Sequence, residues 1–572
     1  MKMKMKKSRF ILILVLTVFA VHFLTGTAKK EDKPLSLSAR VDAVFSENDR
    51  PDTPGAAVAV IKDGKVVYQK GFGCANLEYG IPITAKTVFD IASVAKQFTG
   101  MAVAMLAEQG KLSLDDDIRK HIPEVPDFGK TITLRHLVHH TSGIKDWAEV
   151  LAVAGWKFAD VISFEQILKM VTYQKELNFD PGAEHLYSNT GYNLLAETVK
   201  RVTGKSFRDW TWENIFKPLG MTKTHFHDNH REIVKNRAYS YMFNRAEGYL
   251  NAVEGLTALG SSSLYSTVED LAQWMLNLET GKIGGKAVIQ KMHSKGILNS
   301  GKEIDYAFGL AYDTYKGLKR IGHSGGWQGF QTALHHYPDQ RFGVVVLCNL
   351  GLLSAGRLAE QVADIYLEAE LQKKKLEKKE PIKRKAIKVN PDIYNRYEGQ
   401  YKLRPGVDIT ITREGNRIMA QAAGQSKFQL LPESETKFFL ETADIQVTFQ
   451  KDEKGSVYQL TLHQGGRNMP ARKIVPMSPM TPGERQEFTG TYYCEELDTR
   501  YTIIIRDNKL VLTHRRHSDF LLERTDGDHF TGNVWFFRSV TFLRDKLQKV
   551  TGFKISGKQA RNIVFTKDGI TK

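Results

Sequence analysis

A stretch near residue 100 is predicted to form a helix buried on all sides, which requires a large domain around it. Apolar residues recur at 98, 101, 102, 105 and 106, the spacing of one helix face. The opposite face carries Gly100, Val103 and Ala104, and no charged residue follows Lys96 until Glu108. A helix that is apolar on both faces lies in the centre of a fold.

Two polar residues stand at the start of this helix. Ser93 and Lys96 are three positions apart, so their side chains share one helix face. Burial disfavours a charged amine, and we therefore expect a lowered pKa for Lys96. A nearly neutral lysine beside a serine can accept the hydroxyl proton and make the oxygen a nucleophile. The pattern is also common by chance, as a capped helix with a solvated lysine, so other motifs must support it.

Length, charge and cysteines limit the possible classes. The 572 residues suit two to four domains. The net charge of +17 predicts attraction to anionic envelope surfaces rather than nucleic-acid binding, because no nucleic-acid recognition motif accompanies it. The three cysteines, Cys74, Cys348 and Cys494, form no CxxC pair and no disulfide framework.

The first 28 residues have the pattern of an export signal. A lysine-rich start precedes an apolar run at 10–24, and Gly26-Thr27-Ala28 offers a small-residue cleavage site. The run is short for a membrane span, although an uncleaved anchor fits as well. We therefore expect a protein exported to the periplasm, the cell surface or the extracellular medium, in contact with a membrane only through this leader if it is uncleaved.

The pattern after the leader indicates a mixed domain over residues 29–372. Asp-Gly between the apolar runs 56–61 and 66–72 predicts a β-hairpin. Four further elements are predicted: a strand at 306–312, a hairpin of strands 331–337 and 342–349, and a closing amphipathic helix at 352–371. The lysine-rich residues 373–388 are expected to form a solvated, flexible linker.

Beyond the linker, short alternating strands replace helices and part of the sequence occurs twice. The segment at 397–401 is echoed at 488–492, each ending in Gly-x-Tyr. The repeat predicts two small antiparallel barrels or sandwiches, at residues 389–478 and 479–572.

Other histidine- and tyrosine-bearing motifs admit two interpretations each. Tyr187 precedes a predicted helix, where the positive helix end and a lysine could activate it, or where it simply packs a loop. The turn His140-Thr141-Ser142-Gly143 is better explained as structural than as catalytic. The run 225–230, His-Phe-His-Asp-Asn-His, resembles zinc-hydrolase ligands, but a solvated histidine-rich loop explains it more simply, and we predict no metal.

Three motifs occur in order: Ser93-x-x-Lys96, Tyr187-x-Asn189 and His323-x-Gly325. Together they resemble the serine β-lactamase and penicillin-binding-protein superfamily, in particular its branch of class C β-lactamases, DD-peptidases, D-aminopeptidases and esterases. The resemblance covers about residues 40–372. The repeated tail is similar to the lipocalin-like barrels of D-aminopeptidase-type members.

The resemblance implies an α+β fold, with an antiparallel sheet flanked by helices, an all-helical lobe and the site between them. It also implies that Ser93 is acylated and that Lys96 and Tyr187 share the acid and base roles, in an order left open. Asn189 would bind substrate and orient Lys96. The backbone N–H groups of Ser93 and of Gly326, in the Gly325-Gly326 pair, would form the oxyanion hole.

One position departs from the family pattern. His323 stands where such β-lactamases usually have a lysine, so the positive charge at neutral pH is smaller. The expected activity is therefore that of a peptidase or esterase on a D-amino-acid peptide or small ester, without a cofactor, rather than efficient β-lactam hydrolysis. The alternative is a penicillin-binding or envelope-sensing protein of low turnover, whose tail modules bind cell-wall material.

Overall fold

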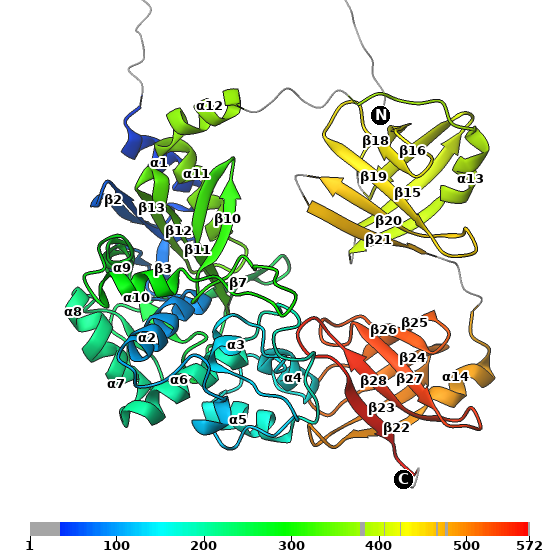
Figure 1. The fold of residues 1–572 in the computed structure, drawn as a ribbon, viewed down its shortest axis with the longest axis horizontal. Coiled ribbons are helices and arrows are strands. Elements are labelled where there is room, and N and C mark those ends of the chain that lie inside the picture. The colour runs from blue at the N-terminus through cyan, green and yellow to red at the C-terminus, as the bar shows by residue number, and fades with distance from the viewer. Residues whose placement is uncertain are drawn as a thin grey trace, which may run out of the picture.

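The computed structural model describes residues 35–377, 384–404, 407–423, 425–464, 467–474 and 479–569. Figure 1 shows an N-terminal domain of helices and strands, followed by two barrels. We call residues 384–474 barrel 1 and residues 479–569 barrel 2. The predicted α+β class with two small all-β units is confirmed. The leader lies outside the described residues.

A six-stranded antiparallel sheet forms the centre of the N-terminal domain. Its strands, in spatial order, are β10 (Ala311–Tyr315), β11 (Leu318–Trp327), β12 (Phe330–Tyr337), β13 (Phe342–Cys348), β1 (Ala56–Lys62) and β2 (Lys65–Phe72). Both predicted hairpins, β1–β2 and β12–β13, are confirmed. The first turns at Asp63 and Gly64, both with positive φ, as a tight hairpin requires.

Hydrophobic side chains cover both faces of the sheet, as the two faces of β1 illustrate. Its side chains alternate between two separate hydrophobic clusters, as the period of a strand dictates. One cluster includes α1 (Leu37–Phe45) and α11 (Ala355–Tyr366), and the other includes α2 (Lys96–Glu108) and α9 (Val268–Thr280). The sheet therefore forms the middle layer of the domain.

The helical lobe and three small sheets complete the domain. The remaining helices are α3 (Leu134–Val138), α4 (Trp147–Val153), α5 (Phe164–Tyr173), α6 (Asn189–Thr203), α7 (Phe207–Thr211), α8 (Lys217–Leu219), α10 (Gly285–Met292) and α12 (Glu368–Glu377). The small sheets pair β3 (Cys74–Asn76) with β4 (Ile81–Pro82), β7 (Tyr241–Asn244) with β8 (Gly248–Asn251), and β9 (Leu264–Ser266) with both β5 (Phe89–Asp90) and β6 (His225–Phe226).

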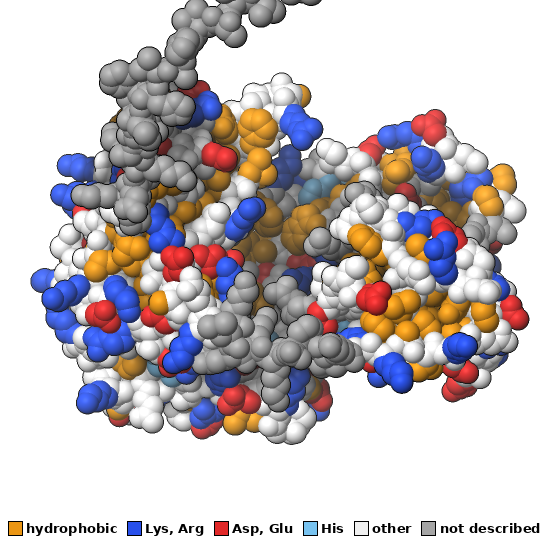
Figure 2. All heavy atoms as spheres, turned by 90° about the horizontal axis from the view of Figure 1, so that it is seen from above, with side chains coloured by type: hydrophobic (Ala, Val, Ile, Leu, Met, Phe, Trp, Pro, Cys, Tyr) orange, Lys and Arg blue, Asp and Glu red, His pale blue; other side chains and the backbone are white. Residues whose placement is uncertain are grey.

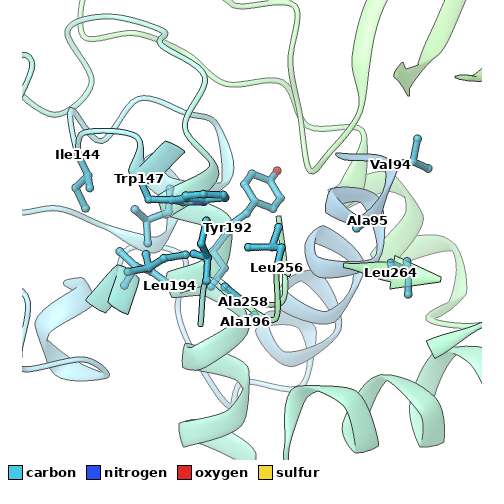
Figure 3. Close-up of a cluster of buried hydrophobic side chains, with 14 of the residues drawn as sticks. Val94, Ala95, Ile144, Trp147, Tyr192, Leu194, Ala196, Leu256, Ala258 and Leu264 are labelled. Atoms are coloured by element: carbon cyan, nitrogen blue, oxygen red, sulfur yellow. The ribbon is translucent and has the colours of Figure 1, made fainter. Parts of the chain in front are cut away.

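Helix α2 is the buried central helix that the sequence predicts. Every residue from Lys96 to Leu106 is buried. Figure 3 shows Val94 and Ala95, just ahead of α2, near a cluster that includes Tyr192 of α6 and Leu264 of β9. The first turn of α2, which contains Lys96, is therefore buried in the interior of the protein.

Both tail units are closed eight-stranded antiparallel barrels, each preceded by a short helix. Barrel 1 contains α13 (Tyr394–Tyr397), β14 (Gly399–Arg404), β15 (Val407–Glu414), β16 (Arg417–Ala422), β17 (Phe428–Pro432), β18 (Lys437–Phe439), β19 (Ile445–Lys451), β20 (Val457–Gln464) and β21 (Arg467–Ile474). Barrel 2 contains α14 (Pro482–Phe488), β22 (Gly490–Cys494), β23 (Thr499–Arg506), β24 (Lys509–Thr513), β25 (Phe520–Asp526), β26 (His529–Gly532), β27 (Ser539–Arg544), β28 (Val550–Ser556) and β29 (Ile563–Lys567).

The sequence echo corresponds to a shared structural device. Tyr401 donates a hydrogen bond to the Tyr397 carbonyl at 2.7 Å, and Tyr492 donates one to the Phe488 carbonyl at 2.7 Å. In each barrel the tyrosine of the first strand therefore bonds the end of the preceding helix. Aromatic and aliphatic side chains fill the interior of barrel 1.

The two barrels relate differently to the N-terminal domain. Barrel 2 shares one continuous hydrophobic core with it, and Figure 1 shows barrel 2 beside α4. No hydrogen bond or ion pair among the described residues joins barrel 1 to either neighbour. Figure 2 shows a hollow between barrel 1 and the N-terminal domain. Only barrel 2 is therefore built into the domain.

Three predicted elements are wrong. The helix predicted at 352–371 is two helices, α11 and α12, divided at Leu367. The strand predicted at 306–312 begins only at Ala311, because Gly309 turns the chain with φ +74°. The first residues of the predicted flexible linker belong to α12, and residues 378–383 lie outside the described residues. Within the described ranges, no helix is long and apolar enough to cross a membrane.

Candidate active site

The Lys96 amine lies at the centre of a polar cluster inside the protein. Its Nζ is 3.2 Å from Ser93 Oγ, 2.7 Å from Asn189 Oδ1 and 2.8 Å from the Ser261 carbonyl. The side chain is fully buried. Burial lowers the pKa of Lys96 to about 7, and the charge of Asp146 opposes that shift only in part. A large fraction of the amine is therefore neutral near pH 7.

The nucleophile candidate sits on a tight turn against strand β11. Ser93 lies in a 3₁₀ turn, Ala92–Ala95, that runs directly into α2. Ala92 has φ +49°, and its N–H donates to Asp90 at 2.7 Å. A Cβ on Gly325 would lie 2.5 Å from the Ile91 carbonyl. Residue 325 must therefore be glycine for β11 to pass this close to the serine.

Tyr187 and Asn189 stand at the start of α6, where they face Lys96. The amine lies 4.7 Å from the Tyr187 ring centre. Burial raises the pKa of Tyr187 above its ordinary value, although a hydrogen bond with Ser93 lowers it in part. Asp146, the N-cap of α4, accepts the Asn189 backbone N–H and fixes the start of α6. The phenol is therefore protonated at neutral pH, unlike much of the lysine.

His323 is a neutral imidazole whose two nitrogen atoms are both engaged. Its Nδ1 is 2.6 Å from the Ser324 carbonyl, which can only accept, so Nδ1 carries the proton. Its Nε2, 3.1 Å from the Tyr306 hydroxyl, then accepts a hydrogen bond. Burial, and secondarily Lys96, lower the pKa of His323 to about 4. The position offers no positive charge at neutral pH.

These residues open into one pocket of about 540 Å³. Ser93, Tyr187 and His323 line it, together with Ser324, Gly325, Gly326, Gln331, Thr332 and the start of α11 at 354–356. Apart from the neutral His323, no side chain in this lining is ionisable near pH 7. Of the predicted site residues, the pocket thus gathers Ser93, Tyr187, His323 and the glycine pair, with Lys96 and Asn189 bonded behind Ser93.

The turn at His140 supports the site without lining it. The His140 ring lies 4.3 Å from the Tyr187 ring, between ring centres, and its Nδ1 accepts the Ser188 N–H at 3.1 Å. Burial keeps the pKa of His140 well below its ordinary value, so the ring is neutral. The structural interpretation of this turn is confirmed, and its role is to hold the tyrosine segment in place.

Barrel 2 supplies a loop, residues 557–561, that packs against the back of the site. The Glu149 carboxylate of α4 is only 2% exposed and accepts the backbone N–H groups of three consecutive loop residues, Lys558, Gln559 and Ala560. A Cβ on Gly557 would lie 1.7 Å from this carboxylate. The loop is therefore clamped onto the N-terminal domain by one buried acid.

Within the loop, Gln559 bonds the segments that carry the site residues. Its side-chain amide donates to the Tyr187 carbonyl at 2.6 Å, and its own carbonyl accepts from the Asp146 N–H at 3.1 Å. Nearby, Lys145 and Glu496 of barrel 2 form an ion pair at 2.9 Å with both side chains buried. Of these residues in the contact with barrel 2, sequence patterns could have identified only Asp146, because an aspartate ahead of an apolar run is a typical helix N-cap.

The chain is similar to known proteins over most of its length. The family profile Beta-lactamase matches residues 41–367, and the profile Domain of unknown function (DUF3471) matches residues 383–473. Penicillin-binding protein 4* of Bacillus subtilis (strain 168) is 30% identical over 421 residues, covering 68% of this chain and 89% of that protein. D-aminopeptidase of Gluconobacter oxydans (strain 621H) is 26% identical over 472 residues, covering 81% and 84%.

The arrangement of the chain also has a counterpart among solved structures. The octameric penicillin-binding protein homologue from Pyrococcus abyssi matches with a TM-score of 0.52 and 25% identity, over 84% of this chain and 98% of that chain. The profile match covers more than half of the sequence and includes the Ser93–Lys96 contact at the head of the buried helix. This chain is therefore a serine hydrolase of the beta-lactamase family.

Proposed function

We propose that the protein hydrolyses an amide or ester bond through an acyl-enzyme on Ser93, with a D-amino-acid peptide, a D-amino-acid amide or a small ester as substrate. The observation that carries this proposal is the buried Lys96 amine, with a pKa of about 7, at 3.2 Å from Ser93 Oγ. The similarity to a D-aminopeptidase supports the substrate class.

The geometry supports one order of proton transfers. Lys96 takes the Ser93 proton as the oxygen bonds to the substrate carbonyl carbon, because the Tyr187 phenol is protonated and cannot act first. Backbone N–H groups of Ser93 and Gly326 stabilise the oxyanion. As the C–N or C–O bond breaks, the proton passes through Tyr187 to the leaving group. Water then attacks the ester by the reverse route, releasing the acid and free Ser93.

This assignment predicts a pH dependence. The active form of Lys96 is the neutral amine, so kcat/KM should rise as pH increases through about 7 and level off above it. Replacing Asn189 with aspartate puts a negative charge beside Nζ, raises the pKa of Lys96 and should move this rise upward by roughly one pH unit or more. The measurement is the pH profile of kcat/KM for a chromogenic ester. An unmoved profile in Asn189→Asp would contradict the role of Lys96.

The uncharged pocket predicts a preference among substrates. A carboxylate next to the scissile bond would meet a neutral His323 and no cation in the pocket lining. Burying it without a partner is unfavourable. We expect kcat/KM for a D-amino-acid amide to exceed that for the matched D-amino-acyl peptide ending in a free carboxylate by at least about tenfold. L-enantiomers serve as the control for stereochemistry. Equal values for amide and carboxylate would refute the preference.

We also propose export and a role for barrel 1 in the envelope. The leader pattern of residues 1–28 supports export, and the absence of bonds from barrel 1 to its neighbours, within the described residues, leaves its surface accessible to cell-wall material. Cell fractionation with N-terminal sequencing of the mature protein tests export. Co-sedimentation of full-length Ser93→Ala protein with purified cell wall tests binding, and a protein that stays in the supernatant would oppose it.

A further inference from the structure

Two histidines outside the active site face each other at the edge strand β6, with His225 on the strand and His227 directly after its end. His225 and His227 alternate with Phe226, which packs into the core, so both imidazoles lie on the other face of the strand. The distance from His225 Nε2 to His227 Nδ1 is 3.3 Å. The sequence alone suggests a solvated loop here, but the structure buries His227 to 2% exposure.

A carboxylate completes the cluster from the following turn. Oε2 of Glu232 is 3.9 Å from His227 Nδ1, and the three ligand atoms all lie within 4.8 Å of one another. Tetrahedral zinc with bonds of about 2.0–2.1 Å places its ligand atoms roughly 3.3 Å apart. The two nitrogen atoms already have this separation, and Glu232, on a partly exposed turn, needs only a small movement to join them.

The two imidazoles are neutral and the carboxylate is held in place by a neighbouring guanidinium. Burial lowers the pKa of both histidines, that of His227 to about 4, so neither ring is protonated at neutral pH. Arg208 bonds both oxygens of Glu232, at 2.6 and 2.8 Å, and also Asp228 at 3.0 Å. It holds the carboxylate in place from behind, as groups bonded to metal ligands commonly do. Arg237, whose charge also acts on His227, brings the sum of the four charged side chains to zero.

We propose that His225, His227 and Glu232 bind a divalent transition-metal ion, of which zinc best fits two imidazoles and one carboxylate. His225 and Glu232 also line a pocket of about 400 Å³, which gives solvent access to the fourth ligand position. His227 Nε2 has no hydrogen-bond partner in the described structure, so the polar contacts of this buried ring are those of Nδ1, which faces His225 and Glu232.

The ion would stabilise the small sheet β5–β9–β6, which leads into the Ser93 turn, without taking part in the reaction. Strand β6 pairs with β9, and β9 pairs with β5, which leads into Ile91 and Ser93. The Ile91 N–H donates to the Leu264 carbonyl of β9 at 2.9 Å. Zinc bridging β6 to the Glu232 turn would therefore resist local opening of this sheet. The expected effect is on thermal stability and not on the acylation chemistry.

The test uses full-length protein treated with EDTA, dialysed and titrated with zinc chloride, with competition from a chromogenic chelator. We expect one zinc ion per chain at micromolar or lower concentration and a higher Tm with zinc. His225→Gln and His227→Gln should lose both effects, whereas Glu232→Gln, on a partly exposed turn, should keep the fold and weaken binding about tenfold or more. His529→Gln, at a surface histidine of barrel 2, is the matched control.

Two results would overturn the proposal. One is zinc binding by the wild type that requires millimolar metal. The other is equal stoichiometry and affinity in the wild type and in a folded His225→Gln/His227→Gln double variant, which would place the zinc elsewhere. The Ser93 labelling rate of the metal-free wild type is measured in parallel, so that failure of the zinc site and failure of the hydrolase assignment are separate outcomes.

Discussion

Replacing Ser93 with alanine is expected to abolish covalent labelling and lower kcat by roughly 10⁴-fold or more, because Ser93 is the pocket hydroxyl that lies within hydrogen-bond distance of the Lys96 amine in the described structure. Lys96→Ala should leave the oxygen in place and remove its base, so labelling should slow by a similar factor. Lys96→Arg should not restore it, since a guanidinium stays charged at every accessible pH. The measurement is intact mass after incubation with a fluorophosphonate or penicillin probe, followed by peptide mapping.

Ser142→Ala is the control for this experiment. Ser142 belongs to the neighbouring His140 turn, and its hydroxyl accepts the Ile144 N–H at 3.3 Å within that loop. We expect this variant to label like the wild type. An adduct that survives in Ser93→Ala, or that maps to any other peptide, would remove Ser93 from the chemistry and leave a binding protein of low turnover as the better interpretation.

Replacing Glu149 with leucine is expected to reduce kcat/KM by about 10²-fold, although this residue does not line the pocket. The carboxylate accepts three backbone N–H groups of the 557–561 loop, which would be left buried and unpaired. The loop would then move, and Gln559 would release the Tyr187 carbonyl and the Asp146 N–H. Steady-state kinetics and urea unfolding of the full-length protein measure the two consequences.

Glu184→Gln is the matched control at the same interface. Glu184 pairs with Arg561 of the loop at 3.0 Å, but both side chains are substantially exposed. Exposed ion pairs contribute about 0–1 kcal/mol, so stability and kcat/KM should barely change. A Glu149→Leu protein that keeps wild-type kcat/KM would show that the loop is only a surface contact. Gln559→Ala then separates positioning from stability, because it removes the side-chain bond alone.

The parts that sequence predicts well are those whose determinants are close in the chain. Ser93 and Lys96 share one turn, and the charge-free run after them requires the burial that lowers the amine pKa. Asp63-Gly64 defines the first hairpin, and the repeated Gly-x-Tyr segment marks the two barrels. In the first two cases the pattern and its consequence lie within one helix or one hairpin, whereas the barrels are recognised because one local pattern occurs twice, at 397–401 and 488–492.

The remaining features depend on pairs of residues that are far apart in the chain. Glu149 and Gln559 are 410 residues apart in the chain, and nothing in the sequence near either residue indicates that the Gln559 N–H donates a hydrogen bond to the Glu149 carboxylate. The Ser261 carbonyl, which bonds Lys96, is a backbone group that any residue would supply. The strand predicted to begin at Tyr306 is wrong for a related reason. The alternating residues around Tyr306 suggest a strand, but Gly309 turns the chain, and the Tyr306 hydroxyl contacts His323 instead.

If Glu149→Leu has the expected effect, the clamp between α4 and the 557–561 loop also sets when the protein can reach full activity during its synthesis. A ribosome finishes every residue that lines the Ser93 pocket by the start of α11, about 200 residues before it reaches the loop. At about 5–20 residues per second, the roughly 200 residues between 356 and 561 take some 10–40 s to translate. Throughout that interval the nascent hydrolase lacks Gln559. A late frameshift, or proteolytic loss of barrel 2, is accordingly expected to lower kcat/KM at least as much as Glu149→Leu does, although the nucleophile, the base and the pocket lining are all present.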